Sequence, residues 1–76
     1  MTFREYLMAR RVTDTPMGDF VADAKADRTF PDGDVTWVQV ELHLRGRRAS
    51  EAAIKAGKAV WGMYLQRRHL QATGAK

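Results

Sequence analysis

Cysteine is absent from this chain of 76 residues, and proline occurs only twice. Without cysteine, neither a disulfide bond nor a thiolate metal site can form, so packing alone must stabilise the fold. The most apolar late stretch, AVWGMYL, is far shorter than the roughly 20 residues that span a bilayer. The N-terminal stretch MTFREYLMARR lacks the apolar centre of a signal peptide. We therefore expect a cytoplasmic protein with no membrane partner.

Size and composition predict one small globular domain. Apolar residues make up 45% of the chain and charged residues 29%, an ordinary composition for a folded protein. A chain this short buries only about 60% of the surface that its unfolded form exposes, so its core must be thin. We expect the domain to cover residues 1–71, with a frayed tail at residues 72–76.

The two halves of the chain differ in the sign of their charge. Residues 1–34 contain five basic and seven acidic groups, whereas residues 35–76 contain eight basic and two acidic groups. The two halves could pair with each other, or the second half could offer a basic surface to a polyanion.

Residues 2–11 have the pattern of an amphipathic helix. Thr2 and Glu5 have the spacing of a capping box, which satisfies backbone amides at a helix start. Apolar side chains then recur at i, i+3 and i+4, which places them on one side of the helix: Phe3, Tyr6 and Leu7.

A second helix is predicted from Thr15, a good N-cap, and Pro16 suits its first position because the missing N–H costs nothing there. Gly18, in the first turn, would let another backbone approach closely. The helix must end before Pro31, and Phe30 is expected to tie the following turn to the core. The apolar stripe of this helix consists of Met17, Phe20, Val21 and Ala24.

Three aspartates, Asp19, Asp23 and Asp27, are spaced four apart along this second helix and would share one face. Such carboxylates can perform acid–base chemistry or hold magnesium. In a structural interpretation, Asp19 complements the helix N-terminus, while Asp23 and Asp27 lie in water or pair with nearby basic groups. We favour the structural interpretation because a thin-cored domain has little room for a catalytic pocket. The three residues then form a candidate acidic interaction face.

The stretch VTWVQVELHLRGR fits two kinds of secondary structure. Alternation of apolar and polar residues is typical of a half-buried strand, with Val38, Val40, Leu42 and Leu44 on one face. A helix would instead group Trp37, Val40, Glu41 and Leu44 on one side. No second convincing strand exists to pair with, and a lone strand would leave its backbone groups unpaired. We therefore expect a helix.

The last predicted helix begins after Ser50, a natural N-cap, and Glu51 and Lys55 could pair on its outer side. Gly57 and Gly62 each cost up to about 1 kcal/mol in a helix interior, a cost that is tolerated where another helix crosses closely. The residues expected to pack inward are Ile54, Gly57, Trp61, Tyr64 and Leu65.

Several short motifs spread over about residues 3–64 resemble those of one family. They are FREYL, DTPMGDF, DRTFP, the aromatic residue Trp37, HL ahead of GRRAS, and VWGMYL. In these motifs the chain resembles the YozE SAM-like family of small bacterial proteins, whose fold is similar to the sterile alpha motif. The resemblance implies an all-α fold: a compact bundle of four to five short helices with a long C-terminal helix. The family carries no established activity, so it transfers no functional residues.

Other catalytic and metal-binding patterns are weak. His43 and His69 have no partner at metal-ligand spacing. Ser50 is the only serine, and a helix cap explains it better than a nucleophile does. No glycine-rich phosphate loop follows a strand. We therefore expect no enzyme activity, cofactor, metal or small-molecule substrate.

The basic residues of the second half are the sharpest functional signal. Such groups can contact phosphates without reading a base sequence. The candidate polyanion-binding residues are Arg45, Arg47, Arg48, Lys55, Lys58, Arg67 and Arg68. We expect a small non-enzymatic module that binds another macromolecule through charged surfaces, with a protein partner or self-association as the first hypothesis and nucleic-acid backbone binding as the alternative. The acidic face and the first four of these basic residues could also meet head to tail between copies.

Overall fold

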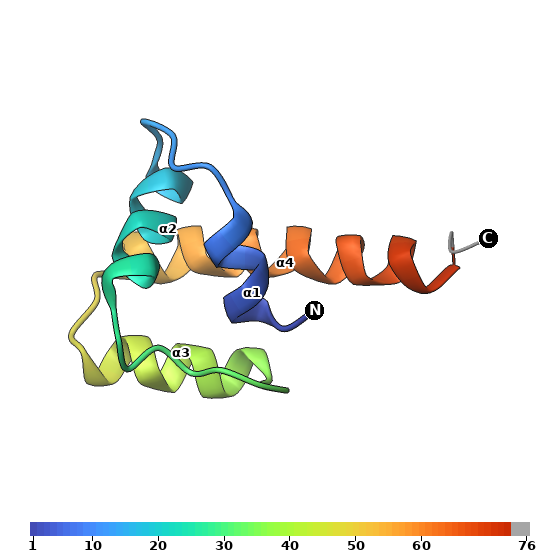
Figure 1. The fold of residues 1–76 in the computed structure, drawn as a ribbon. Helices are drawn as coiled ribbons and strands as arrows, with labels where there is room; N and C mark the ends of the chain where they lie inside the picture. The colour runs from blue at the N-terminus through green and yellow to red at the C-terminus, as the bar shows by residue number, and fades with distance from the viewer. Residues whose placement is uncertain (74–76) are drawn as a thin grey trace.

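Four helices make up the computed structural model, which describes residues 1–73. Helix α1 spans Phe3–Ala9, α2 Pro16–Ala26, α3 Trp37–Gly46 and α4 Glu51–Thr73. In Figure 1, α1, α2 and α3 gather around one end of α4, whose C-terminal end projects beyond them. None of these helices combines the length and the apolarity that crossing a bilayer requires. The all-α prediction is confirmed, and the C-terminal helix is the longest, with 23 residues.

Helix α1 starts at the predicted cap. The Thr2 hydroxyl oxygen accepts a hydrogen bond from the Glu5 amide at 3.1 Å, and the Glu5 carboxylate accepts one from the Thr2 amide at 2.8 Å. These two bonds are the capping box expected from the sequence. The helix ends at Ala9, slightly earlier than predicted, and its inner side buries Phe3 and Leu7.

Helix α2 begins as predicted after Thr15, whose hydroxyl oxygen accepts a hydrogen bond from the Gly18 amide at 3.0 Å. Pro16 occupies its first turn. A methyl group at Gly18 would overlap the carbonyl oxygen of Thr13, so the predicted close backbone approach is made by the loop just before the helix. Met17 is only partly buried. The buried members of α2 are Gly18, Phe20, Val21 and Ala24.

Helix α3 resolves the ambiguity between strand and helix in favour of the helix. Thr36 opens it with a second capping box. Val40 and Leu44 are buried on its inner side. Val38 and Leu42, which a strand would have buried with them, are 62% and 64% exposed. The helical spacing therefore decides which apolar residues reach the core.

Helix α4 begins after Ser50, whose hydroxyl oxygen accepts a hydrogen bond from the Ala53 amide at 3.1 Å. At Gly57 the ring of Phe20 packs so closely that an added methyl carbon would lie 2.8 Å from a ring carbon. The close crossing predicted for Gly57 is thus confirmed. Gly62 instead faces open space, so the same prediction is wrong there.

The inner side of α4 is buried only as far as Tyr64. Leu65, which we expected to pack inward, is 43% exposed, because the three other helices lie against the earlier part of α4. Every side chain from Leu65 to Leu70 is exposed. The helix continues to residue 73 and so includes the start of the predicted frayed tail, of which residues 74–76 lie outside the described residues.

Aromatic rings from distant parts of the chain meet in the core. Phe3 is fully buried, and its ring centroid lies 4.8 Å from that of Trp61, 5.2 Å from Tyr64 and 6.0 Å from Phe30. Tilted and edge-on contacts of this kind are favourable beyond the area they bury. Phe30 is buried as predicted and ties the turn after α2 to the core.

A residue in the left-handed conformation ends α3. Arg48 has a φ of 62°, a region that favours glycine. Its amide donates to the Arg45 carbonyl at 3.0 Å, and the Ala49 amide donates to the Leu44 carbonyl at 3.0 Å. These hydrogen bonds form a left-handed helix cap in which arginine holds the position that glycine usually takes.

We expect Arg48→Gly to raise the free energy of unfolding by about 0.5–1 kcal/mol, because glycine adopts positive φ without steric cost. For a domain of this size the change corresponds to a Tm increase of about 4 °C. Arg48→Ala is the control, since it removes the same side chain but keeps the strained conformation. Thermal unfolding followed by circular dichroism measures both variants. If both variants raised the Tm equally, the effect would come from the loss of the arginine side chain, and the explanation by backbone strain at Arg48 would be wrong.

Candidate functional site

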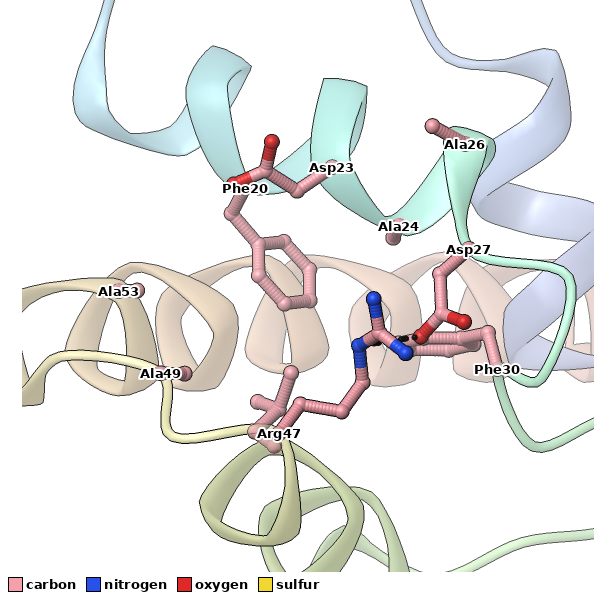
Figure 2. A pocket seen from close by; sticks show the side chains of 10 residues that line it. Phe20, Asp23, Ala24, Ala26, Asp27, Phe30, Arg47, Ala49 and Ala53 are labelled. Carbon is pink, nitrogen blue, oxygen red and sulfur yellow. Dashed lines mark ion pairs between the residues drawn. The ribbon is translucent and has the colours of Figure 1, made fainter.

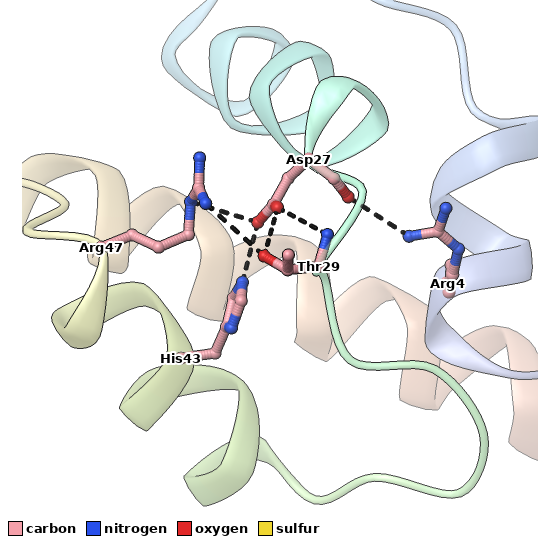
Figure 3. Close-up of polar contacts among 5 residues, drawn as sticks. All are labelled: Arg4, Asp27, Thr29, His43 and Arg47. Carbon is pink, nitrogen blue, oxygen red and sulfur yellow. Dashed lines mark hydrogen bonds and ion pairs between the residues drawn. The ribbon is translucent and has the colours of Figure 1, made fainter.

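Helix α2 ends at a buried carboxylate. Asp27 is its C-cap, has an extended backbone and is only 8% exposed. Thr29 donates to the Asp27 Oδ1 atom twice, from its amide at 2.9 Å and from its hydroxyl at 2.6 Å. This turn, in which an aspartate binds the backbone two residues on, fixes the position of the carboxylate between α2 and α3, as Figure 3 shows.

Two side chains from the C-terminal end of α3 approach the second carboxylate oxygen. His43 Nε2 lies 2.7 Å from Asp27 Oδ2, and Arg47 Nε lies 3.2 Å from the same atom (Figure 3). Four residues separate His43 from Arg47, so both reach the same side of the helix. Arg4 of α1 donates from Nη1 to the backbone carbonyl of Asp27 at 3.5 Å. Asp27 therefore links α1, α2 and α3.

The carboxyl group of Asp27 is held in its charged form. Burial by itself would raise its pKa, but hydrogen bonds from His43 and Thr29, together with the charge of Arg47, outweigh burial and keep the pKa well below its usual range. Thr29 occupies Oδ1, and His43 and Arg47 occupy Oδ2. A carboxylate engaged in this way is poorly suited to take a proton from a substrate. The arrangement fits an anchor between helices.

Two adjoining hollows lie along α2. The first has a volume of about 320 Å³ and lies between α2 and the junction of α3 with α4 (Figure 2). The second has a volume of about 250 Å³ and lies between α2 and the start of α4. Because Phe20, Asp23 and Ala53 line both hollows, we treat them as one surface feature and call it the α2 groove.

The α2 groove combines apolar walls with negative charge. Three carboxylates line it against a single guanidinium, that of Arg47. Arg47 is already paired with Asp27, whereas Asp19 and Asp23 make no ion pair within residues 1–73. The groove is therefore acidic along α2. Its apolar lining consists of the exposed or half-buried Ala26, Ala49 and Ala53 and of Phe20, Phe30 and Leu44, which are themselves buried.

The predicted acidic face is only partly formed. Asp19 and Asp23 are exposed on α2 and line the groove. Asp27, expected beside them, is buried instead. The helix ends there, and the extended backbone of Asp27 no longer follows the helical spacing that would have placed it on the same face. Pairing with basic groups, which the structural interpretation allowed, is what Asp27 does.

Two of the seven predicted polyanion-binding residues are neutralised by carboxylates. Arg45 places Nη2 2.8 Å from Glu41 Oε2 and Nη1 2.8 Å from Glu51 Oε2. Hydrogen bonds with Glu51 and Glu41 raise the pKa of Arg45, and the bond with Arg45 lowers the pKa of Glu51. Glu51 therefore pairs with Arg45 and not, as we expected, with Lys55. Arg47 holds the second ion pair, described above.

The other five predicted basic residues are exposed and lie in two groups along the chain. Lys58 Nζ lies 5.7 Å from the ring centroid of Trp37, and the Arg68 guanidinium lies 5.7 Å from that of Tyr64. Lys55 and Arg67 are 12 residues apart, which corresponds to about 18 Å along the axis of α4. One group lies near the start of α4 and the other near its end. The five residues are Arg48, Lys55, Lys58, Arg67 and Arg68.

The histidines do not form a metal site in the described part of the chain. Within residues 1–73, no group of three or more histidine, aspartate or glutamate side chains is arranged to hold a metal ion. His43 binds Asp27 and packs edge-on against Phe30, with ring centroids 5.6 Å apart. His69 is exposed on the C-terminal part of α4.

Sequence analysis missed the contact of Asp27 with His43 and Arg47. Two local signals were present: the spacing of Asp27 and Thr29, which suits a turn closed by the aspartate, and the i, i+4 spacing of His43 and Arg47. Neither signal indicates that the end of α2 faces the end of α3. That information is tertiary, because it depends on how the two helices pack against α4.

The helices and their caps define a small all-α domain, and comparison with known families agrees. A family model described as the YozE SAM-like fold matches residues 2–66. The chain belongs to the YozE SAM-like family, as its motifs indicated. Neither the curated proteins nor the solved structures gave a match to the chain. The family supports the helical fold and assigns no activity.

Proposed function

We propose that the protein is a small non-catalytic interaction module that binds a basic segment of another protein in the α2 groove. The observation that carries the proposal is the composition of this groove, in which the exposed carboxylates of Asp19 and Asp23 adjoin apolar walls. Apolar surface supplies affinity, while the carboxylates favour basic partners and disfavour acidic ones.

Arginine and lysine side chains match this groove chemically. Their alkyl stems pack on apolar surface while their charged heads remain free to reach a carboxylate. In the α2 groove such a surface comes mainly from Ala26, Ala49 and Ala53, because Phe20 is only 3% exposed. A volume of about 320 Å³ suffices for one or two side chains of a partner.

The contacts of Asp27 support the non-catalytic part of the proposal. Asp27 is the most buried carboxylate of the groove, and both of its oxygens accept hydrogen bonds from the protein itself. A general base must instead reach a proton of the substrate. Asp27 therefore holds the groove in shape, and Asp19 and Asp23 are the groups left to meet a partner.

A matched pair of peptides tests the proposal by fluorescence anisotropy. The first peptide is a labelled amphipathic helix with leucine and arginine at helical spacing, and the second has glutamate in place of each arginine. We expect the basic peptide to bind with an affinity that falls as salt rises, and the acidic peptide not to bind. Asp23→Lys should weaken the binding at least about tenfold, because it places like charges together in the groove.

The control variant is Asp14→Lys, which makes the same change of charge in the exposed loop before α2, outside the groove. It should leave the affinity for the basic peptide close to that of the unchanged protein. Equal binding of the two peptides, or an equal loss in Asp14→Lys and Asp23→Lys, would show that the α2 groove is not the site.

Nucleic-acid backbone binding is a second function that one observation favours. Arg48, Lys55, Lys58, Arg67 and Arg68 are exposed and make no ion pair within residues 1–73. A labelled DNA duplex therefore belongs in the same titration. Binding of the duplex that falls steeply with salt and weakens in Arg67→Ala with Arg68→Ala, without binding of the basic peptide, would replace the protein-binding proposal.

A further inference from the structure

We propose that the occupant of the α2 groove is the C-terminal end of α4 from a second copy of the chain, so that copies join head to tail. The inference rests on the proposed function, since it names the basic segment that the groove accepts. It differs from the pairing suggested by the sequence, because Arg45 and Arg47 at the junction of α3 and α4 already hold ion pairs within their own chain.

The end of α4 has the chemistry that the groove requires. Every side chain from Leu65 to Leu70 is exposed, whereas the earlier part of α4 is packed against the other helices. Arg67 and Leu70 are three residues apart and so are neighbours on the helix surface. Leu65 and Arg68 form a second pair with the same spacing. Each pair combines an apolar side chain with a cation.

The leucines at the end of α4 supply apolar surface that a partner can bury. Leu65 is 43% exposed and Leu70 is 58% exposed, so both leave apolar surface in water on a helix that no other element of residues 1–73 covers. Burying a leucine side chain is worth about 1.5–3 kcal/mol. The groove offers apolar surface on Ala26, Ala49 and Ala53 and carboxylates in Asp19 and Asp23.

The two surfaces lie at opposite ends of the molecule. Ala53, near the start of α4, lines the groove, and Arg67 lies 14 residues further along the same helix, about 21 Å away. A continuous helix cannot bend its own end back into the groove beside its start, so the occupant must come from another copy. Because the two surfaces differ, each added copy leaves one of each kind free, so the assembly grows as an open chain unless the rotation between copies closes it into a ring.

The contact should be weak and sensitive to salt. The end of one helix buries less surface than the roughly 1,200 Å² at which stable interfaces begin, so association requires high protein concentration. Exposed charge pairs contribute to it and are screened above about 0.1 M salt. We expect short oligomers in exchange with the monomer, not a permanent complex.

Sedimentation velocity on the full chain tests the inference. In low salt, the average mass of the unchanged protein should rise with concentration, and in about 0.5 M salt it should return toward that of a monomer. The groove variant Asp23→Lys and the end variant Arg67→Gln with Leu70→Gln should each remain monomeric. Glutamine is a good helix former, so the end variant keeps α4 intact, which circular dichroism verifies.

Mixing the two variants separates head-to-tail association from other geometries. The groove variant keeps an intact α4 end, and the end variant keeps an intact groove, so the mixture can form one contact and no more. We expect a dimer in the mixture and no larger species. The control Asp14→Lys, outside both surfaces, should associate like the unchanged protein.

Three results would overturn the inference: a monomer at all concentrations in low salt, an equal loss of association in Asp14→Lys, or a mixture of the two variants that stays monomeric or forms larger oligomers. The peptide titration distinguishes this failure from failure of the proposed function. If the chain is monomeric, but its groove binds the basic peptide and Asp23→Lys abolishes that binding, then only the proposal of self-association is wrong. If the peptide does not bind either, the groove is not an interaction site.

Discussion

Replacing Asp27 by alanine is expected to lower the free energy of unfolding at neutral pH by about 3 kcal/mol. The change leaves the amide and hydroxyl of Thr29 without their acceptor, and it removes the hydrogen bond with His43 and the ion pair with Arg47. Because Asp27 joins the end of α2 to the end of α3, its loss also loosens one wall of the α2 groove. Urea unfolding followed by circular dichroism measures the difference.

The effect of Asp27 should depend on pH, and its direction follows from the pKa. The folded state holds the pKa of Asp27 well below its ordinary value of 3.8, through the hydrogen bonds and the Arg47 charge that outweigh burial. A depressed pKa stabilises the fold fully above the unfolded value and loses that stabilisation as pH falls from about 4 toward the folded value. The difference in stability between the unchanged protein and Asp27→Asn should therefore shrink below about pH 4.

Two comparisons make the pH prediction specific. Asp27→Asn keeps the shape of the side chain, removes its charge and replaces one acceptor oxygen by an NH2 donor. The part of its effect that changes with pH therefore reports the charge. Asp23→Asn removes a carboxylate that is exposed and unpaired within residues 1–73, and it should change stability at pH 7 by less than about 0.5 kcal/mol. A difference between Asp27→Asn and the unchanged protein that stays constant from pH 7 to about pH 2.5 would assign the loss to packing and contradict the role of charge.

Local patterns predicted three of the helices from the chemistry of their starts: Thr2, Thr15 and Ser50. Thr36 caps α3 in the same way, although that helix was predicted because the sequence offers no partner strand. In each case the side-chain oxygen accepts a hydrogen bond from a backbone amide that has no partner within the helix. These bonds join residues three apart in the sequence, so they can be found without knowledge of the fold.

Contacts between helices were harder to predict. The i, i+4 spacing of Glu51 and Lys55 is real, but Glu51 pairs with Arg45, which the turn between α3 and α4 brings close. Leu65 follows the periodicity of the buried side of α4, yet it is exposed because the other helices end before it. Periodicity gives the side of a helix that is apolar, and only the packing shows how far along that side the core extends.

The candidate site shows the same limit. The sequence placed Asp19 and Asp23 on an exposed face, and they do line the α2 groove. It also placed Asp27 with them, and this prediction is wrong. Helical spacing holds only while the helix lasts, and α2 ends just before Asp27, which is its C-cap. The groove itself is formed by α2 together with the α3–α4 junction and the start of α4, so no single segment contains it.

Gly18→Ala should lower the free energy of unfolding by about 2 kcal/mol, although alanine is the better helix former by up to about 1 kcal/mol. An added methyl carbon would overlap the Thr13 carbonyl oxygen and lie 2.6 Å from the carbonyl carbon. The backbone of the loop would have to move, and the side chain of Thr13 is hydrogen-bonded to that of Thr15, which caps α2.

Gly62→Ala is the matched control, because Gly62 lies inside α4 with nothing within 4 Å of an added methyl carbon. It should raise the free energy of unfolding by about 0.5–1 kcal/mol through helix propensity alone. The same substitution is thus expected to act in opposite directions at two helical glycines. Chemical unfolding of both variants measures the pair, and a stabilised Gly18→Ala would show that the loop before α2 can move away at little cost. In that case the close contact with Thr13 would not be what requires glycine at the start of α2.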